Sequence, residues 1–151
     1  MIPLLIIDSN VVAKWFFPEH LTEKALAVRD DWQIGAVELI APELLLIEVC
    51  YVIRTKTRIQ IITPEESKST MQNLLSLEIP TIPIYPLLVT ANEFAIVFEL
   101  TIYDALYLAL AQELSGTLIT ADPWLYHSLS LKLNGIEFLE NYQSEFPNTR
   151  R

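Results

Sequence analysis

The chain has 151 residues, of which 52% are hydrophobic and 19% are charged. This is the length of one ordinary domain, and the composition is too apolar for a disordered chain. The single cysteine, Cys50, excludes an intramolecular disulfide and a cysteine-rich zinc site, and with them a secreted disulfide scaffold. The net charge of −9 disfavours broad adhesion to a phosphate backbone, so we expect no direct binding of duplex DNA. A nucleic-acid substrate held through metal ions and a local basic patch is still compatible with this charge.

The first apolar run of the chain stops at Asp8 and has no basic leader. It is too short for a signal peptide or a membrane span. We therefore expect a cytoplasmic protein that has no contact with a membrane.

Strand-length apolar runs alternate with segments of helical spacing along the chain. In chain order, the pattern predicts a strand over 4–7, a helix after Asp8, a helix over 21–32, a strand over 39–41, helices over 43–57 and 64–77, a strand over 80–84, helices over 87–100 and 101–115, a strand over 117–120, a helix from 122 to about 133 and a strand over 136–139. A polar tail follows from about residue 141.

Cap and turn residues set several of these boundaries. The glycines at 35, 116 and 135 are predicted to end helices. Pro42 is predicted to open the helix over 43–57, and Thr63 to cap the next helix with Pro64 at its first position. The front half of 43–57 is apolar almost all round, so we expect it to be buried.

Short buried strands between helices predict one α/β domain with a mostly parallel sheet and right-handed crossovers. The two prolines of the strand over 80–84 place that strand near a sheet edge or at a strand start. The sequence contains no internal repeat or linker. Because it has only three glycines, neither a G-x-G-x-x-G motif nor a P-loop is present, and both dinucleotide binding and NTP hydrolysis of that kind are excluded.

Four acidic residues fall where strands end or where a helix is expected to be buried: Asp8, Glu48, Asp104 and Asp122. A role as a helix cap alone remains open for each of the three aspartates. Glu48 is different, because the apolar run 44–53 leaves it no polar face. An isolated buried carboxylate is costly, so Glu48 should be protonated, paired or bound to a metal.

The predicted topology brings these acids to one edge of the sheet. Asp8 and Asp122 follow predicted strands, and open α/β sheets place their ligand crevice at the carboxyl ends of the strands. Four carboxylates in one pocket repel each other and raise each other's pKa values unless a divalent cation neutralises them. Oxygen ligands alone favour Mg²⁺ or Mn²⁺ over zinc or copper.

Three segments, in this order and spacing, resemble a PIN domain and most closely the VapC-type toxins: IDSNVVAKWFFPE, APELLLIEVCYVI and TIYDALYLALAQELSGTLITAD. The resemblance runs from residue 6 to about 139 and implies a single PIN-like domain over 1–151, a three-layer α/β/α fold with helices on both sides of a parallel sheet. It maps the acidic tetrad of the family onto Asp8, Glu48, Asp104 and Asp122. Thr120 matches a hydroxyl position of the family, and Asn10 stands where many members have Ser or Thr. Pro123 and Trp124 replace the charged residues of some members, which argues against a fifth acidic ligand.

The resemblance implies a metal-dependent endoribonuclease that uses one or two Mg²⁺ or Mn²⁺ ions, ~3.5–4 Å apart where there are two. Asp8, Asp104 and Asp122 are expected to bind the metal, with Glu48 as a further ligand or as the carboxylate that orients the attacking water. Asn10 and Thr120 are expected to hold these carboxylates in place. The identity of the RNA remains open, as does the choice between the two metals.

The resemblance also implies partners. A toxin of this type pairs with a VapB-like antitoxin, whose C-terminal segment covers the site, and forms a homodimer. Lys14 lies one helical turn from Asn10 and is expected to reach a phosphate of the RNA. Arg54, Lys56 and Arg58 form either a solvated helix end or a patch along which RNA lies.

Other functions are weighed against this one. The main alternative is a PIN-like interaction scaffold without activity, although all four acids are present. A metal-free ribonuclease would need a histidine pair, and the chain offers only His20 and His127. A phospho-acceptor receiver domain would need an acidic pair at the first strand and a lysine after a late strand, and the sequence has neither pattern.

Overall fold

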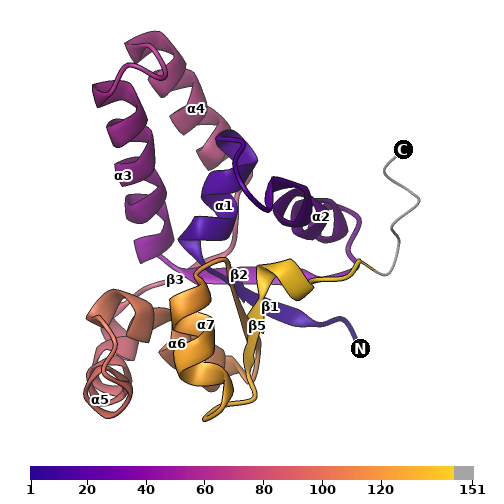
Figure 1. Cartoon of the computed structure of the whole chain (residues 1–151), viewed down its shortest axis with the longest axis vertical. Helices are drawn as coiled ribbons and strands as arrows, with labels where there is room; N and C mark the ends of the chain where they lie inside the picture. The colour runs from indigo at the N-terminus through magenta and orange to yellow at the C-terminus, as the bar shows by residue number, and fades with distance from the viewer. Residues whose placement is uncertain (145–151) are drawn as a thin grey trace.

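The computed structural model describes residues 1–144, whose five strands form one parallel sheet in the order β3-β2-β1-β4-β5 (Figure 1). The strands are β1 (Leu4–Ile7), β2 (Glu38–Pro42), β3 (Thr81–Ile82), β4 (Thr117–Thr120) and β5 (Ile136–Phe138). All four pairings between neighbouring strands are parallel. The predicted fold class is therefore confirmed, and β3 lies at the predicted edge.

Helices cover both faces of this sheet, as the three-layer prediction requires. They are α1 (Ser9–Phe16), α2 (Thr22–Gln33), α3 (Leu44–Arg58), α4 (Pro64–Ser76), α5 (Leu88–Phe98), α6 (Ile102–Leu114) and α7 (Pro123–Ser130), with 3-10 turns η1 (Tyr85–Leu87) and η2 (Leu139–Asn141). Figure 1 shows α1 and α2 on one side of the sheet and α5 and α6 on the other. The helices α3 and α4 form a hairpin that projects away from the sheet.

The core lies on both faces of the central strands. Leu5, Ile6 and Ile7 of β1 are all buried, because both faces of a parallel sheet are covered by helices. Every residue of α6 from Ala105 to Ala111 is buried as well, and this helix contacts β1, β2 and β4. Among the described helices, none is both long and apolar enough to cross a membrane by itself.

Three boundary predictions are wrong. Pro42 ends β2 and does not open α3, because the ladder with β3 continues to Glu43, whose N–H donates to the carbonyl of Ile82. Residue 115, in the left-handed conformation at φ 52°, ends α6 in place of Gly116. Helix α7 ends at Ser130, so Gly135 lies in the turn before β5. Gly35 does follow the end of α2, with a φ of 80°, as predicted.

The prediction that the front half of α3 is buried is also wrong. Ile47 and Tyr51 are largely exposed, while Leu45 and Val49 on the opposite face are buried. The cause is the projecting hairpin: α3 packs mainly on α1 and α4, and within residues 1–144 the face that carries Ile47 and Tyr51 stays open.

At the carboxyl end of the described chain, Tyr142 is buried, and its hydroxyl donates to the carboxylate of Asp31 at 2.6 Å. Of the tail predicted from about residue 141, residues 145–151 lie outside the described residues.

Gly116 allows a close approach between β4 and β1. A Cβ at this position would clash with Cδ1 of the fully buried Ile6 and would lie 3.1 Å from the carbonyl oxygen of Leu4. We expect Gly116→Ala to lower the free energy of unfolding by about 1–3 kcal/mol, because the core must shift to admit the methyl group. Urea unfolding measures this. Gly135→Ala is the matched control, since its Cβ would meet nothing nearer than 3.4 Å, and an equal loss in both variants would contradict the prediction.

Candidate functional site

Asp8 stands at the carboxyl end of the central strand, between β1 and α1, and is only 4% exposed. Its extended backbone makes it the N-cap of α1, and its Oδ1 accepts a hydrogen bond from the N–H of Ser9 at 2.8 Å. Its Oδ2 accepts from the hydroxyl of Thr120 at 2.8 Å and from the Asn10 amide at 3.1 Å. Capping accounts for one oxygen of Asp8, and the other is held by side chains.

Thr120 and Asn10 tie the end of β4 to the end of β1. The Thr120 oxygen accepts from the backbone N–H of Asp122 at 3.1 Å and from the Asn10 amide at 3.3 Å. The Asn10 side-chain oxygen accepts from the N–H of Ala121 at 2.9 Å. These two side chains therefore hold the Asp8 carboxylate and the backbone before Asp122 in one network.

The other two aspartates begin helices at the same edge of the sheet. Asp122 is the N-cap of α7, and its Oδ1 accepts from the N–H groups of Trp124 and Leu125 at 2.9 and 3.4 Å. Asp104 lies in the first turn of α6, where its N–H donates to the hydroxyl of Thr101 at 3.1 Å. A hydrogen bond with the Thr101 side chain also acts on the Asp104 carboxyl and lowers its pKa, so this residue takes part in the cap as well.

Glu48 on α3 is paired, and its partner is a residue that the sequence analysis did not identify. The hydroxyl of Tyr107 on α6 donates to Oε1 of Glu48 at 2.7 Å. Tyr107 is buried in the apolar centre of α6, where a phenol needs a hydrogen-bond partner. That need was the available signal, but it does not identify a glutamate 59 residues away. Glu48 itself is partly exposed, which corrects the expectation of full burial.

The acidic side chains at this edge interact electrostatically, and the pKa values of Asp8 and Asp104 are raised. Burial, together with the charges of Asp104 and Glu48, raises the pKa of Asp8 to about 7 against the lowering effect of the Thr120 hydrogen bond. Burial also raises the pKa of Asp104 to about 6, with further contributions from Asp122 and Glu48. Burial raises the pKa of the Tyr107 phenol far above its usual range, so it stays a donor to Glu48.

This set of groups fits a hard divalent cation by its chemistry. The ligands on offer are carboxylate oxygens, which Mg²⁺ and Mn²⁺ prefer, and their mutual repulsion is what such an ion relieves. In residues 1–144 no three side chains of the His, Cys, Asp and Glu types are already arranged to hold an ion. Binding therefore requires that Asp8 and Asp104 release their protons and that the carboxylates come closer together around the ion.

Lys14 is not placed at the rim as predicted. It is 8% exposed, and its Nζ lies 2.7 Å from Oε1 of Glu19. The physical reason is the short turn after α1, which returns Glu19 to the side chain of Lys14. A lysine that is buried and paired in this way does not offer its charge to a phosphate.

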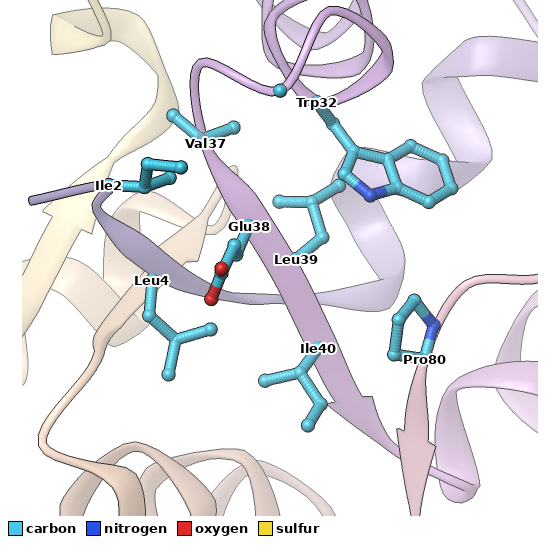
Figure 2. Close-up of a pocket in the computed structure, with 9 residues that line it drawn as sticks. Ile2, Leu4, Trp32, Val37, Glu38, Leu39, Ile40 and Pro80 are labelled. Carbon is cyan, nitrogen blue, oxygen red and sulfur yellow. The ribbon is translucent and has the colours of Figure 1, made fainter.

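A cavity of about 390 Å³ lies at the end of the sheet opposite to the acidic residues (Figure 2). It is formed around the starts of β1 and β2 and by Pro80. Glu38 is the one charged side chain among the nine residues that line it, and the others are mostly apolar. The acidic edge is therefore the better candidate for chemistry.

Thr120→Val is expected to raise the pKa of Asp8 above 7 and to lower the free energy of unfolding by about 1–3 kcal/mol. The variant removes the donor to Asp8 Oδ2 and leaves the N–H of Asp122 without its acceptor. NMR titration of the Asp8 carboxyl and urea unfolding measure the two effects. Thr120→Ser keeps the hydroxyl and should keep both values, and a Val variant that does the same would contradict the assigned network.

Comparisons with known proteins agree with the fold described above. Three solved structures have a similar fold: a toxin-antitoxin complex from Klebsiella pneumoniae (TM-score 0.61, 16% identity, covering 91% of this chain and 97% of that one), PAE2754 from Pyrobaculum aerophilum (0.64, 20%, 92% and 90%) and FitAB bound to an IR36 DNA fragment (0.66, 14%, 94% and 99%). No curated protein sequence matches significantly. The PIN domain profile matches residues 5–127, which is most of the chain. The chain therefore belongs to the PIN domain family.

Proposed function

We propose that this chain is a metal-dependent endoribonuclease and the toxin of a VapBC-like toxin-antitoxin pair. PIN domains are generally nucleases, and this membership supports the reaction class. The observation that carries the proposal is the electrostatic coupling of four carboxyl groups at the carboxyl edge of the sheet, with the pKa of Asp8 raised to about 7. A site that only capped helices would not need to bring these acids together.

In this proposal Asp8, Asp104 and Asp122 hold the metal, and Glu48 binds it or orients the attacking water. When bound, Mg²⁺ or Mn²⁺ neutralises the charge that grows on the phosphate and lowers the pKa of a bound water. The amide of Asn10 and the hydroxyl of Thr120 fix the Asp8 carboxylate, so that it keeps one orientation toward the ion.

The Tyr107 hydroxyl fixes Glu48 in a similar way. With Oε1 held by this bond, Oε2 of Glu48 has no hydrogen-bond partner among residues 1–144 and is the oxygen that would accept a proton from water. The donor comes from α6, the same helix that carries Asp104, so one rigid element positions two of the four acids.

The partner predictions belong to this proposal as well. The Klebsiella pneumoniae structure is a toxin-antitoxin complex, and FitAB is bound to DNA in its structure. A net charge of −9 supports the assignment of any DNA binding to the antitoxin and not to this chain. We propose in addition a homodimer and a cytoplasmic location.

The test is incubation of the purified protein with a labelled single-stranded RNA in Mg²⁺ or Mn²⁺, with EDTA as the control. Cleavage that requires the metal is expected. Cleavage that persists in EDTA would contradict the metal-dependent mechanism and favour the His20 and His127 alternative. A folded protein that neither cleaves the RNA nor binds Mn²⁺ would favour the scaffold without activity.

A further inference from the structure

A cleft of about 450 Å³ opens beside the acidic cluster, between α3 and the start of α6. Its lining includes Ser9 and Glu48 from the site and Ile47, Tyr51 and Tyr103 from the surface next to it. Ser9 follows Asp8 in the chain, and Tyr103 precedes Asp104. The cleft is therefore continuous with the proposed site.

The two tyrosines in this cleft are unusually exposed for aromatic residues. Tyr51 is 72% exposed and Tyr103 is 56% exposed. Within residues 1–144, neither ring is paired with another aromatic ring. Flat aromatic faces that are open to solvent beside a phosphate-cleaving site are suited to stacking on nucleotide bases.

The charges around the cleft indicate why stacking is needed. Lys14 is buried and paired with Glu19, so it offers no charge to the substrate. Arg54 is exposed and lies three residues beyond Tyr51 on α3, on the same side of the helix as Ile47 and Tyr51. Along α3, Tyr51 therefore lies between Glu48 of the acidic cluster and the cation Arg54. In this order, the base of a nucleotide would face Tyr51 and the neighbouring phosphate would face Arg54.

We propose that Tyr51 and Tyr103 form a stacking site for an unpaired RNA base next to the scissile phosphate, with Arg54 facing the neighbouring phosphate. This inference rests on the proposed nuclease function. Because a base in a duplex is stacked on its neighbours, the site selects RNA whose target nucleotide is unpaired. It also explains how a chain with a net charge of −9 binds RNA, since stacking tolerates a surface poor in cations.

The test compares Leu with Phe at both tyrosines, because Leu keeps apolar bulk and Phe also keeps the aromatic face. The probe is a fluorescein-labelled single-stranded RNA decamer, with its Kd measured by fluorescence anisotropy in Ca²⁺ and the absence of product checked on a gel. Tyr51→Leu and Tyr103→Leu are each expected to weaken binding about five- to one-hundredfold. Tyr51→Phe and Tyr103→Phe are expected to stay within about twofold of the original protein.

Two controls sharpen this comparison. Tyr85→Leu removes an exposed tyrosine that does not line the cleft, and it should leave the Kd unchanged. The duplex form of the same RNA should bind weakly and should not distinguish the Leu variants from the original protein. Circular dichroism of each variant checks that the exposed substitutions leave the fold intact.

Leu variants that bind the single strand as tightly as the original protein would overturn the stacking site and leave the cleft to a protein partner. Equal losses in the Leu and Phe variants would overturn it too, since the hydroxyl groups would then carry the binding. Either result, with metal-dependent cleavage by the original protein intact, leaves the nuclease proposal in place. An original protein that neither binds nor cleaves RNA would instead overturn the proposed function itself.

Discussion

Replacing Asp8 with Asn is expected to reduce metal-dependent RNA cleavage by more than about 100-fold, because the variant loses the central metal ligand. Mutation of a residue that only supports a metal ligand costs about 10- to 100-fold, and loss of the ligand itself should cost more. The same variant should not be less stable than the original protein at pH 8 in EDTA. Asp8 is nearly fully buried, and burial raises its pKa to about 7, so at pH 8 the metal-free protein carries an ionised carboxylate inside the fold. Asn removes that charge and keeps an acceptor for the N–H of Ser9, but its amide nitrogen cannot accept from Thr120 and Asn10. We expect the removal of the buried charge to offset the loss of these two bonds.

The measurement is a gel assay of labelled RNA together with urea unfolding of the same preparations. Glu38→Gln is the matched control, because it removes an exposed carboxylate at the opposite end of the sheet and should change neither value. Loss of activity together with loss of the fold would make Asp8 a structural cap. Full activity in Asp8→Asn would contradict the whole metal assignment.

The central strands were predictable because their burial is extreme. The runs LLII and TLIT occupy β1 and β4 at the predicted residues, since a parallel strand covered on both faces favours apolar and β-branched residues. Once those strands and their order are known, Asp8 and Asp122 must share one edge. That part of the site follows from local pattern and topology alone.

The surroundings of Glu48 were not predictable in the same way. The sequence of an apolar helix does not show whether the rest of the domain covers the helix or leaves it exposed to solvent. The exposure of Tyr51 on α3 was therefore not predicted. The bond between Tyr107 and Glu48 joins α6 to α3 and depends on how two helices pack. The prediction that Lys14 reaches a phosphate missed its ion pair with Glu19 for a related reason. The spacing of Lys14 from Asn10 on α1 was predicted correctly, but the sequence does not show that the turn after α1 brings Glu19 back to Lys14.

In the absence of metal, the free energy of unfolding is expected to fall between pH 5 and pH 8. The folded pKa values of Asp8 and Asp104, about 7 and about 6, lie above the ordinary value of 3.8. In this window the folded protein therefore binds more protons than the unfolded chain, and stability is lost as the pH rises through the folded pKa values. Asp8 alone contributes about 3 kcal/mol to this loss, at about 1.4 kcal/mol per unit of pH up to its folded pKa.

Mn²⁺ should reverse that loss, and it should do so only where the acids are ionised. An ion that binds the folded state alone stabilises it in proportion to the logarithm of its concentration over Kd, and protons compete for the same carboxylates. Urea unfolding at pH 5, 6.5 and 8, with EDTA or with Mn²⁺, should give a large stabilisation at pH 8 and little at pH 5. Asp8→Asn should weaken both the fall of the free energy of unfolding with pH and the rise of the Mn²⁺ stabilisation with pH. Equal stabilisation by Mn²⁺ at the three pH values would show that the ion binds elsewhere, since only ligands that lose protons in this window make its affinity rise with pH.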